Sequence, residues 1–148
     1  QFLEARRREG DKLAAVIAER VDGIKQVVAH VRAMMPAIRE GQRAKLEARV
    51  ADLEQPLDPG RLEQELVLWL QKLDVEEELD RLDSHIEEIG RVMAADGPVG
   101  RRLDFLLQEF NREANTLGSK SVDRRSSQAA VELKVLIDQV REQVQNLE

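Results

Sequence analysis

Residues Gly100–Ser121, GRRLDFLLQEFNREANTLGSKS, carry the pattern from which the fold of this chain can be predicted. Laid out at about 100° per residue, the stretch places its apolar side chains on one side of a helix. These side chains are Leu103, Leu106, Leu107, Phe110, Ala114 and Leu117. A single apolar stripe is typical of a helix that buries one face against a core. We therefore predict a helix over roughly 99–117, with Gly118 as its C-cap glycine.

Helical periodicity continues on both sides of this stretch. Apolar residues recur at helical spacing from Leu13 to Leu53. We predict one helix of about 50 residues, over about 2–54, that reaches about 75 Å. Pro36 interrupts this pattern without ending it, so we expect the helix to bend there. A second helix is predicted over about 61–95 and a last one over about 122–147, and no segment has the alternation of a strand.

Two segments rich in proline and glycine separate the predicted helices. They are Gln55–Gly60, QPLDPG, and Asp96–Pro98, DGP. The expected fold class is therefore all-α. We expect a long helical hairpin over about 1–95, with its first helix bent at the proline, and two further helices that form a compact helical end over about 98–148.

Composition limits the class of protein. The 148 residues are enough for one domain with a core. Charged residues make up 35% of the chain and aromatic residues 3%, a balance typical of helices. Cysteine is absent, which excludes disulfides, thiolate catalysis and thiolate zinc sites. Because the net charge is −6, a site for phosphates must be a local basic patch.

The hydropathy of the chain and its N-terminal sequence indicate the cellular location of the protein. No apolar run approaches the roughly 20 residues that span a bilayer. No segment resembles a signal peptide. We therefore expect a cytoplasmic protein without a membrane partner. The chain begins at Gln1, without an initiator methionine, and we interpret it as part of a longer protein.

The polar side of the quoted helix is the first candidate site. It carries Arg101, Asp104, Gln108, Arg112 and Asn115, joined by Phe105. Two arginines eleven residues apart on one line can grip successive phosphates through forked donors. The phenylalanine among them can stack on a base, as aromatic residues do in single-strand binding sites. The alternative is a face that packs on a neighbouring helix through ion pairs.

A second polar arc lies on the helix before it. Asp74, Glu78, Arg81 and His85 fall within a narrow arc beside an apolar stripe, with Glu77 at its edge. Carboxylates and one imidazole can bind a hard divalent ion and move a proton. The alternative is a helix face held by salt bridges three and four residues apart.

Two further features lie after the quoted helix. The turn Gly118–Ser121, with Ser119 and Lys120, can offer backbone N–H groups and an ammonium group to an anion, although it lacks the glycine spacing of a P-loop. It can equally be an ordinary solvated loop. On the last helix, Val131 and Val135 form a second small apolar stripe, which points to a subunit contact.

Three blocks of the chain, taken in order, resemble one known family. They are DVEEELDRLDSH (74–85), PVGRRLDFLLQEFNREANTLGSKS (98–121) and VELKVLIDQVREQVQNLE (131–148). Together they closely resemble the C-terminal region of the YicC/YloC family of bacterial endoribonucleases. Members of that family carry an additional N-terminal domain to which nothing here corresponds. If that domain supplies catalytic groups, this chain is incomplete as an enzyme.

The resemblance implies a metal-dependent endoribonuclease that acts on RNA, uses manganese or magnesium, and forms a homo-oligomer, a hexamer in the whole protein. The candidate divalent-ion ligands are Glu77, Glu78, Glu109 and Glu113. The candidate catalytic residues are His85, Glu78, Arg81, Glu109 and Arg112, with the imidazole relaying a proton. The candidate RNA-binding residues are Arg101, Arg102, Phe105, Gln108, Asn115, Ser119 and Lys120.

Two other functions remain open at this point. The same basic face fits an RNA-binding adaptor that does not cleave and instead delivers small RNAs to a partner ribonuclease. The polar faces also fit a structural module that only assembles subunits. Dependence of RNA cleavage on a divalent ion separates the enzyme from the adaptor. Salt-sensitive RNA binding separates the adaptor from the structural module, because phosphate contacts weaken steeply with salt.

Overall fold

The computed structural model describes residues 2–53, 55, 58–95 and 99–147. These residues form five α-helices and no strand, which confirms the all-α class. The helices are α1 (Phe2–Ala51), α2 (Pro59–Leu73), α3 (Glu76–Ala94), α4 (Gly100–Ser119) and α5 (Arg124–Asn146). None of these described helices is long and apolar enough to cross a membrane.

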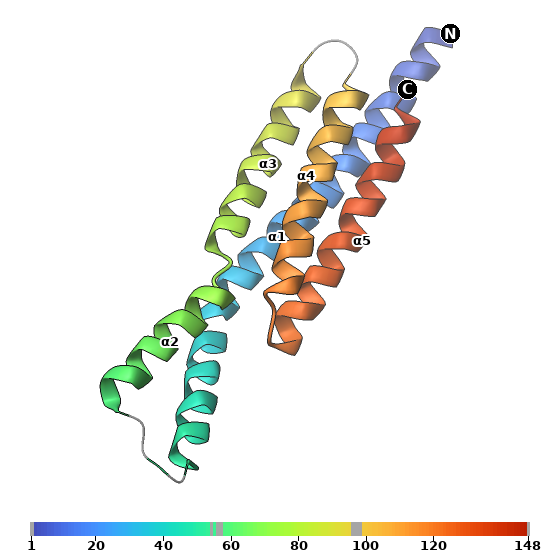
Figure 1. The fold of residues 1–148 in the computed structure, drawn as a ribbon. Helices are drawn as coiled ribbons and strands as arrows, with labels where there is room; N and C mark the ends of the chain where they lie inside the picture. The colour runs from blue at the N-terminus through green and yellow to red at the C-terminus, as the bar shows by residue number, and fades with distance from the viewer. Residues whose placement is uncertain (1, 54, 56–57, 96–98, 148) are drawn as a thin grey trace.

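Helices α1, α3, α4 and α5 form an antiparallel four-helix bundle (Figure 1). Within the bundle, each helix packs against two of the other three: α1 and α4 each contact α3 and α5. The sequence predicts a long hairpin with two further helices at a compact end, and in the structure those two helices, α4 and α5, lie along α1 and α3 and share one core with them. The apolar stripes require this arrangement, since each must be covered by another helix.

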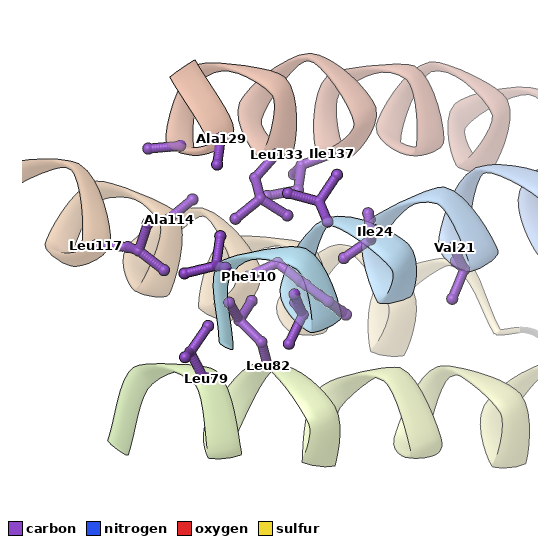
Figure 2. Packing of buried hydrophobic residues seen from close by; sticks show 14 of the residues in the cluster. Val21, Ile24, Leu79, Leu82, Phe110, Ala114, Leu117, Ala129, Leu133 and Ile137 are labelled. Carbon is purple, nitrogen blue, oxygen red and sulfur yellow. The ribbon is translucent and has the colours of Figure 1, made fainter. Parts of the chain in front are cut away.

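The centre of the core lies under α4. Phe110 is 0% exposed and lies among residues of the other three bundle helices (Figure 2). Its neighbours in the cluster include Leu82 of α3, Ile24 of α1 and Leu133 of α5. All six apolar residues that the sequence places on one side of α4 are buried, so the predicted stripe is confirmed.

The C-terminal part of α1 and the whole of α2 project from the bundle as an arm (Figure 1). Leu66 is buried between these two helices, and Arg43 of α1 pairs with Glu63 of α2 at 3.4 Å. Helix α1 continues through Pro36, as expected, and its axis changes direction in its middle part (Figure 1). Proline lacks the N–H that would bond to the preceding turn, which accounts for such a bend.

The prediction of one helix over 61–95 is wrong, because α2 ends at Leu73 and α3 begins at Glu76. Between them Asp74 has an extended backbone, and its carboxylate accepts a hydrogen bond from the backbone N–H of Glu76 at 3.0 Å. Val75 is buried at this break. Aspartate competes with helical hydrogen bonding in this way, and apolar periodicity does not reveal it.

Other predicted boundaries can be compared with the structure. Pro56, Leu57 and the segment 96–98 lie outside the described residues, but α1 ends before the first break and α3 ends before the second. Gly118 is not a C-cap, because α4 continues through it to Ser119. Its position suits a small residue, since a Cβ there would lie 3.5 Å from the Cβ of Ala130 on α5.

The N-terminus of α5 gives a testable prediction. Asp123 caps the helix by accepting a hydrogen bond from the backbone N–H of Arg125 at 2.8 Å. Hydrogen bonds from the Arg125 side chain and backbone lower the pKa of Asp123. Asp123→Ala should therefore reduce the free energy of unfolding by about 1 kcal/mol at neutral pH.

The pH dependence of this effect follows from the direction of the shift. A carboxylate with a lowered folded-state pKa stabilises the protein above its ordinary pKa, and the contribution is lost as the pH falls through the folded-state value. Urea unfolding at neutral and acidic pH should show the difference from wild type shrinking in acid. Asp138→Ala, at an exposed position on the same helix, is the control. Equal losses at both positions would exclude a capping role for Asp123.

Candidate active site between α3 and α4

Helices α3 and α4 bring together the polar arc of one and part of the polar surface of the other. On α3, Glu78, Arg81 and His85 follow each other at intervals of three and four residues, beside the buried stripe. On α4, Glu109 and Glu113 likewise lie at the border of the buried stripe, on the side that faces α3. Because the two helices are antiparallel neighbours, these borders lie beside each other along the contact between α3 and α4.

An ion pair joins the two borders. Arg81 Nε lies 3.0 Å from Oε1 of Glu113, whose side chain is buried. The same guanidinium group lies 3.5 Å from Glu78 and 3.6 Å from the exposed Glu77. The hydrogen bond to Glu113 is the main cause that raises the pKa of Arg81. Arg81 therefore holds a permanent positive charge against the buried Glu113 carboxylate.

Lys120 makes a second connection between the helices. Its Nζ lies 2.9 Å from Oε1 of Glu78 and donates to the backbone carbonyl of Asp74 at 3.1 Å. Glu78 is only 3% exposed, and its Oε2 is buried with no hydrogen-bond partner in the described part of the chain. Ser119 is likewise engaged, since its hydroxyl donates to the carbonyl of Thr116. The predicted anion-binding turn is thus held by contacts within the chain.

A group of three possible metal ligands lies next to the Arg81 ion pair. His85, Glu109 and Glu113 each offer a donor atom, and these atoms all lie within 4.8 Å of one another. Glu109 is half-buried and has no ion-pair partner among the described residues. The His85 ring contacts Phe110 at 5.6 Å between ring centroids, and its Nε2 is buried without a hydrogen-bond partner in the described chain.

This group fits a divalent cation. Two carboxylates and one imidazole are donors that such ions accept in proteins. The unpartnered Nε2 of His85 is a further reason, because buried polar atoms normally have a partner. Of the predicted ligands, Glu109 and Glu113 belong to this group, while Glu78 and Glu77 lie on the far side of Arg81.

The remaining predicted RNA-binding residues lie on the outer side of α4. Arg101, Arg102, Phe105, Gln108, Arg112 and Asn115 are all exposed. The three arginines have no ion-pair partner within the described ranges, so their guanidinium groups are available to a ligand. Asp104 does not share this surface, because it lies toward α5, 3.9 Å from Arg141. Asp104 therefore lies outside the contact between the polar borders of α3 and α4, which Glu109 and Glu113 line.

A charged cluster on the opposite side of α3 was not predicted from the sequence. Arg32 of α1 bonds to Glu76, Asp80 and Asp83 at distances of 2.9, 2.8 and 2.7 Å. Hydrogen bonds to Asp83 and Asp80 raise the pKa of Arg32. This cluster fixes α3 against α1 and so holds the polar arc toward α4. The recurrence of acidic residues at four- and three-residue spacing on α3 was the available signal.

The fold and the site together define an α-helical bundle in which carboxylates, an imidazole and arginines gather where α3 meets α4. Residues 31–148 match the family described as "Endoribonuclease YicC-like, C-terminal", and the chain belongs to this family. The resemblance read from the three sequence blocks is thereby confirmed.

Two relatives cover the whole chain. A protein of Haemophilus influenzae named "Probable endoribonuclease YicC" is 50% identical over 147 residues, which is 99% of this chain and 51% of the relative. A protein of Clostridioides difficile with the same name is 39% identical over 151 residues, covering 100% of this chain and 52% of the relative. The chain therefore spans about half the length of these relatives.

Proposed function

We propose that this chain carries the RNA-cleaving site of a divalent-cation-dependent endoribonuclease, located where α3 and α4 meet. The observation that carries the proposal is the grouping of donor atoms from His85, Glu109 and Glu113 within 4.8 Å. Membership of a family of endoribonucleases supports RNA as the substrate. Exposed arginines on α4 supply the positive charge that phosphates require, although the chain as a whole is acidic.

The donor set favours manganese over magnesium. Magnesium takes oxygen ligands almost exclusively, whereas an imidazole beside carboxylates suits transition metals. A bound divalent ion supplies Lewis acidity, which lowers the pKa of water and offsets charge on a phosphate oxygen. His85, Glu109 and Glu113 would hold the ion, and no other described residues form such a group.

The chain's other residues have distinct roles in this proposal. Arg81 bonds to Glu113 and so fixes the direction of that carboxylate. Phe110 packs against the His85 ring and so fixes the orientation of the imidazole. Arg101, Arg102 and Arg112 bind backbone phosphates through their forked donors. Lys120 positions α3 through Glu78 and is left out of the phosphate-binding set.

Cleavage of a labelled RNA by the full-length protein, with and without manganese, tests the proposal. Glu109→Gln removes a charge without changing shape, and it should lower manganese affinity at least about tenfold, with cleavage falling accordingly. RNA affinity measured in EDTA should stay close to wild type, because the phosphate-binding arginines are unchanged. Glu142→Gln, at an exposed position of α5, is the matched control.

Two results would count against an enzyme of this kind. Cleavage that persists in EDTA would remove the role of the cation. If Glu109→Gln and wild type bind manganese with equal affinity, the ion does not bind at Glu109, and the proposed location between α3 and α4 is wrong. Salt-sensitive RNA binding without any cleavage would instead favour the adaptor.

A further inference from the structure

We propose that a shallow hollow beside the candidate cation site receives one unpaired nucleobase, so that the RNA is single-stranded at the bond to be cleaved. The hollow is lined by Arg101, Arg102, Phe105 and Leu106 of α4 and by Glu88 and Val92 of α3. This inference rests on the proposed function, because it gives the substrate class of that same site. It adds a position for one base relative to the cation.

Phe105 is the central observation. Its side chain is 63% exposed, although it lies on a bundle helix that buries Phe110 completely. Leu106 and Val92 are buried and form an apolar floor beside it. An exposed aromatic ring next to an apolar floor offers a face on which a base can stack, and every base has a face to stack.

The charges around the ring match a nucleotide rather than an uncharged ligand. Arg101 and Arg102 line the hollow and have no ion-pair partner among the residues that the structure describes. They can bind the phosphates on either side of a stacked base. Glu88 is the one carboxylate in the lining, and its charge is offset by Arg91, whose Nε lies 2.8 Å away.

The hollow and the candidate cation site lie about one helical turn apart on the same two helices. On α4, Phe105 precedes Glu109 by four residues, which is one helical turn or about 6 Å along the axis. On α3, Glu88 follows His85 by three residues. Because α3 runs antiparallel to α4, Glu88 is displaced from His85 toward the same end of the bundle as Phe105 is from Glu109. A base on Phe105 thus belongs to a nucleotide next to the phosphate at the cation. In a duplex that base is paired and stacked, and exposing it costs free energy.

Binding measured in EDTA tests this inference without cleavage. The full-length protein is titrated with one fluorescently labelled RNA, either single-stranded or annealed to its complement. Phe105→Ala should weaken single-strand binding about tenfold or more and leave duplex binding unchanged, since a stacked base loses its partner only in the first case. Phe105→Tyr keeps the aromatic face and should bind like wild type.

The outcomes separate this inference from the proposed function. Equal single-strand affinity in Phe105→Ala and wild type would overturn the base site, even if manganese-dependent cleavage is observed. Wild-type protein that cleaves the duplex as fast as the single strand would overturn it as well. Loss of the cation site, by contrast, appears as absent cleavage with the Phe105 effect on binding intact. Manganese affinity should be the same in Phe105→Ala and wild type.

Discussion

Replacing Phe110 with alanine should lower the free energy of unfolding by about 3–5 kcal/mol, because it removes a fully buried ring and leaves a cavity. The cavity would lie at the centre of the bundle, between side chains of α1, α3 and α5 (Figure 2). The same substitution at Phe105 should change the free energy of unfolding by less than about 0.5 kcal/mol, because that ring is on the surface.

Urea denaturation of the two variants and wild type measures both effects. The pair is a close control, since it compares the same residue type on the same helix, five positions apart. The variant at Phe110 should also lose order in the His85 ring, which packs against it. Similar losses for both variants, or a loss below about 1 kcal/mol at Phe110, would contradict the packing described here.

The helices were predictable from the sequence where burial of an apolar stripe alone determines them. The apolar stripe of α4 predicts a helix over roughly 99–117, and the structure has α4 over Gly100–Ser119. The break between α2 and α3 was not predictable, because apolar spacing runs through it. It depends on the side chain of Asp74, which bonds to the backbone of Glu76, and on the burial of Val75. Such local competition is invisible to periodicity.

The candidate site was predictable in its residue types and much less in its groupings. A helical wheel says which residues share a face, but not which neighbouring helix lies over that face. Asp104 faces α5 for this reason, whereas Glu109 faces α3. The burial of Glu113 did have a signal in the sequence. It lies three residues after Phe110 and four before Leu117, directly beside the apolar stripe.

Lys120 makes a contact within the chain that its motif does not indicate. A lysine in a Gly-Ser-Lys turn suggests phosphate binding, and for this reason Lys120 is among the predicted RNA-binding residues. In the structure its ammonium group is bound to Glu78 and to the carbonyl of Asp74. A buried carboxylate attracts such a cation strongly, because water does not compensate its charge. The sequence gives no sign of this, since the two residues lie 42 positions apart.

Lys120→Met should therefore lower the free energy of unfolding by about 2 kcal/mol, because it leaves the buried Glu78 with only the longer contact to Arg81 at 3.5 Å. Replacing both partners removes the buried carboxylate as well, so the double variant Lys120→Met/Glu78→Leu should recover most of the loss. Urea denaturation of the two single variants, the double variant and wild type gives the coupling between the residues. A double variant as unstable as Lys120→Met would show that the ion pair is not what the lysine contributes.

The double variant also separates the two roles of Lys120 in RNA binding. We expect it to fold without the ammonium group, so its RNA affinity can be measured over a range of salt concentrations. If Lys120 binds a phosphate, the slope of log affinity against log salt should decrease by about one contact. If it only connects α4 to α3, the slope should equal that of wild type, while Arg112→Ala in the same assay should reduce it.

We expect the second result, because one ammonium group held by a buried carboxylate and a backbone carbonyl is already satisfied. A reduced slope in the double variant would return Lys120 to the RNA-binding surface and extend that surface to the end of α4.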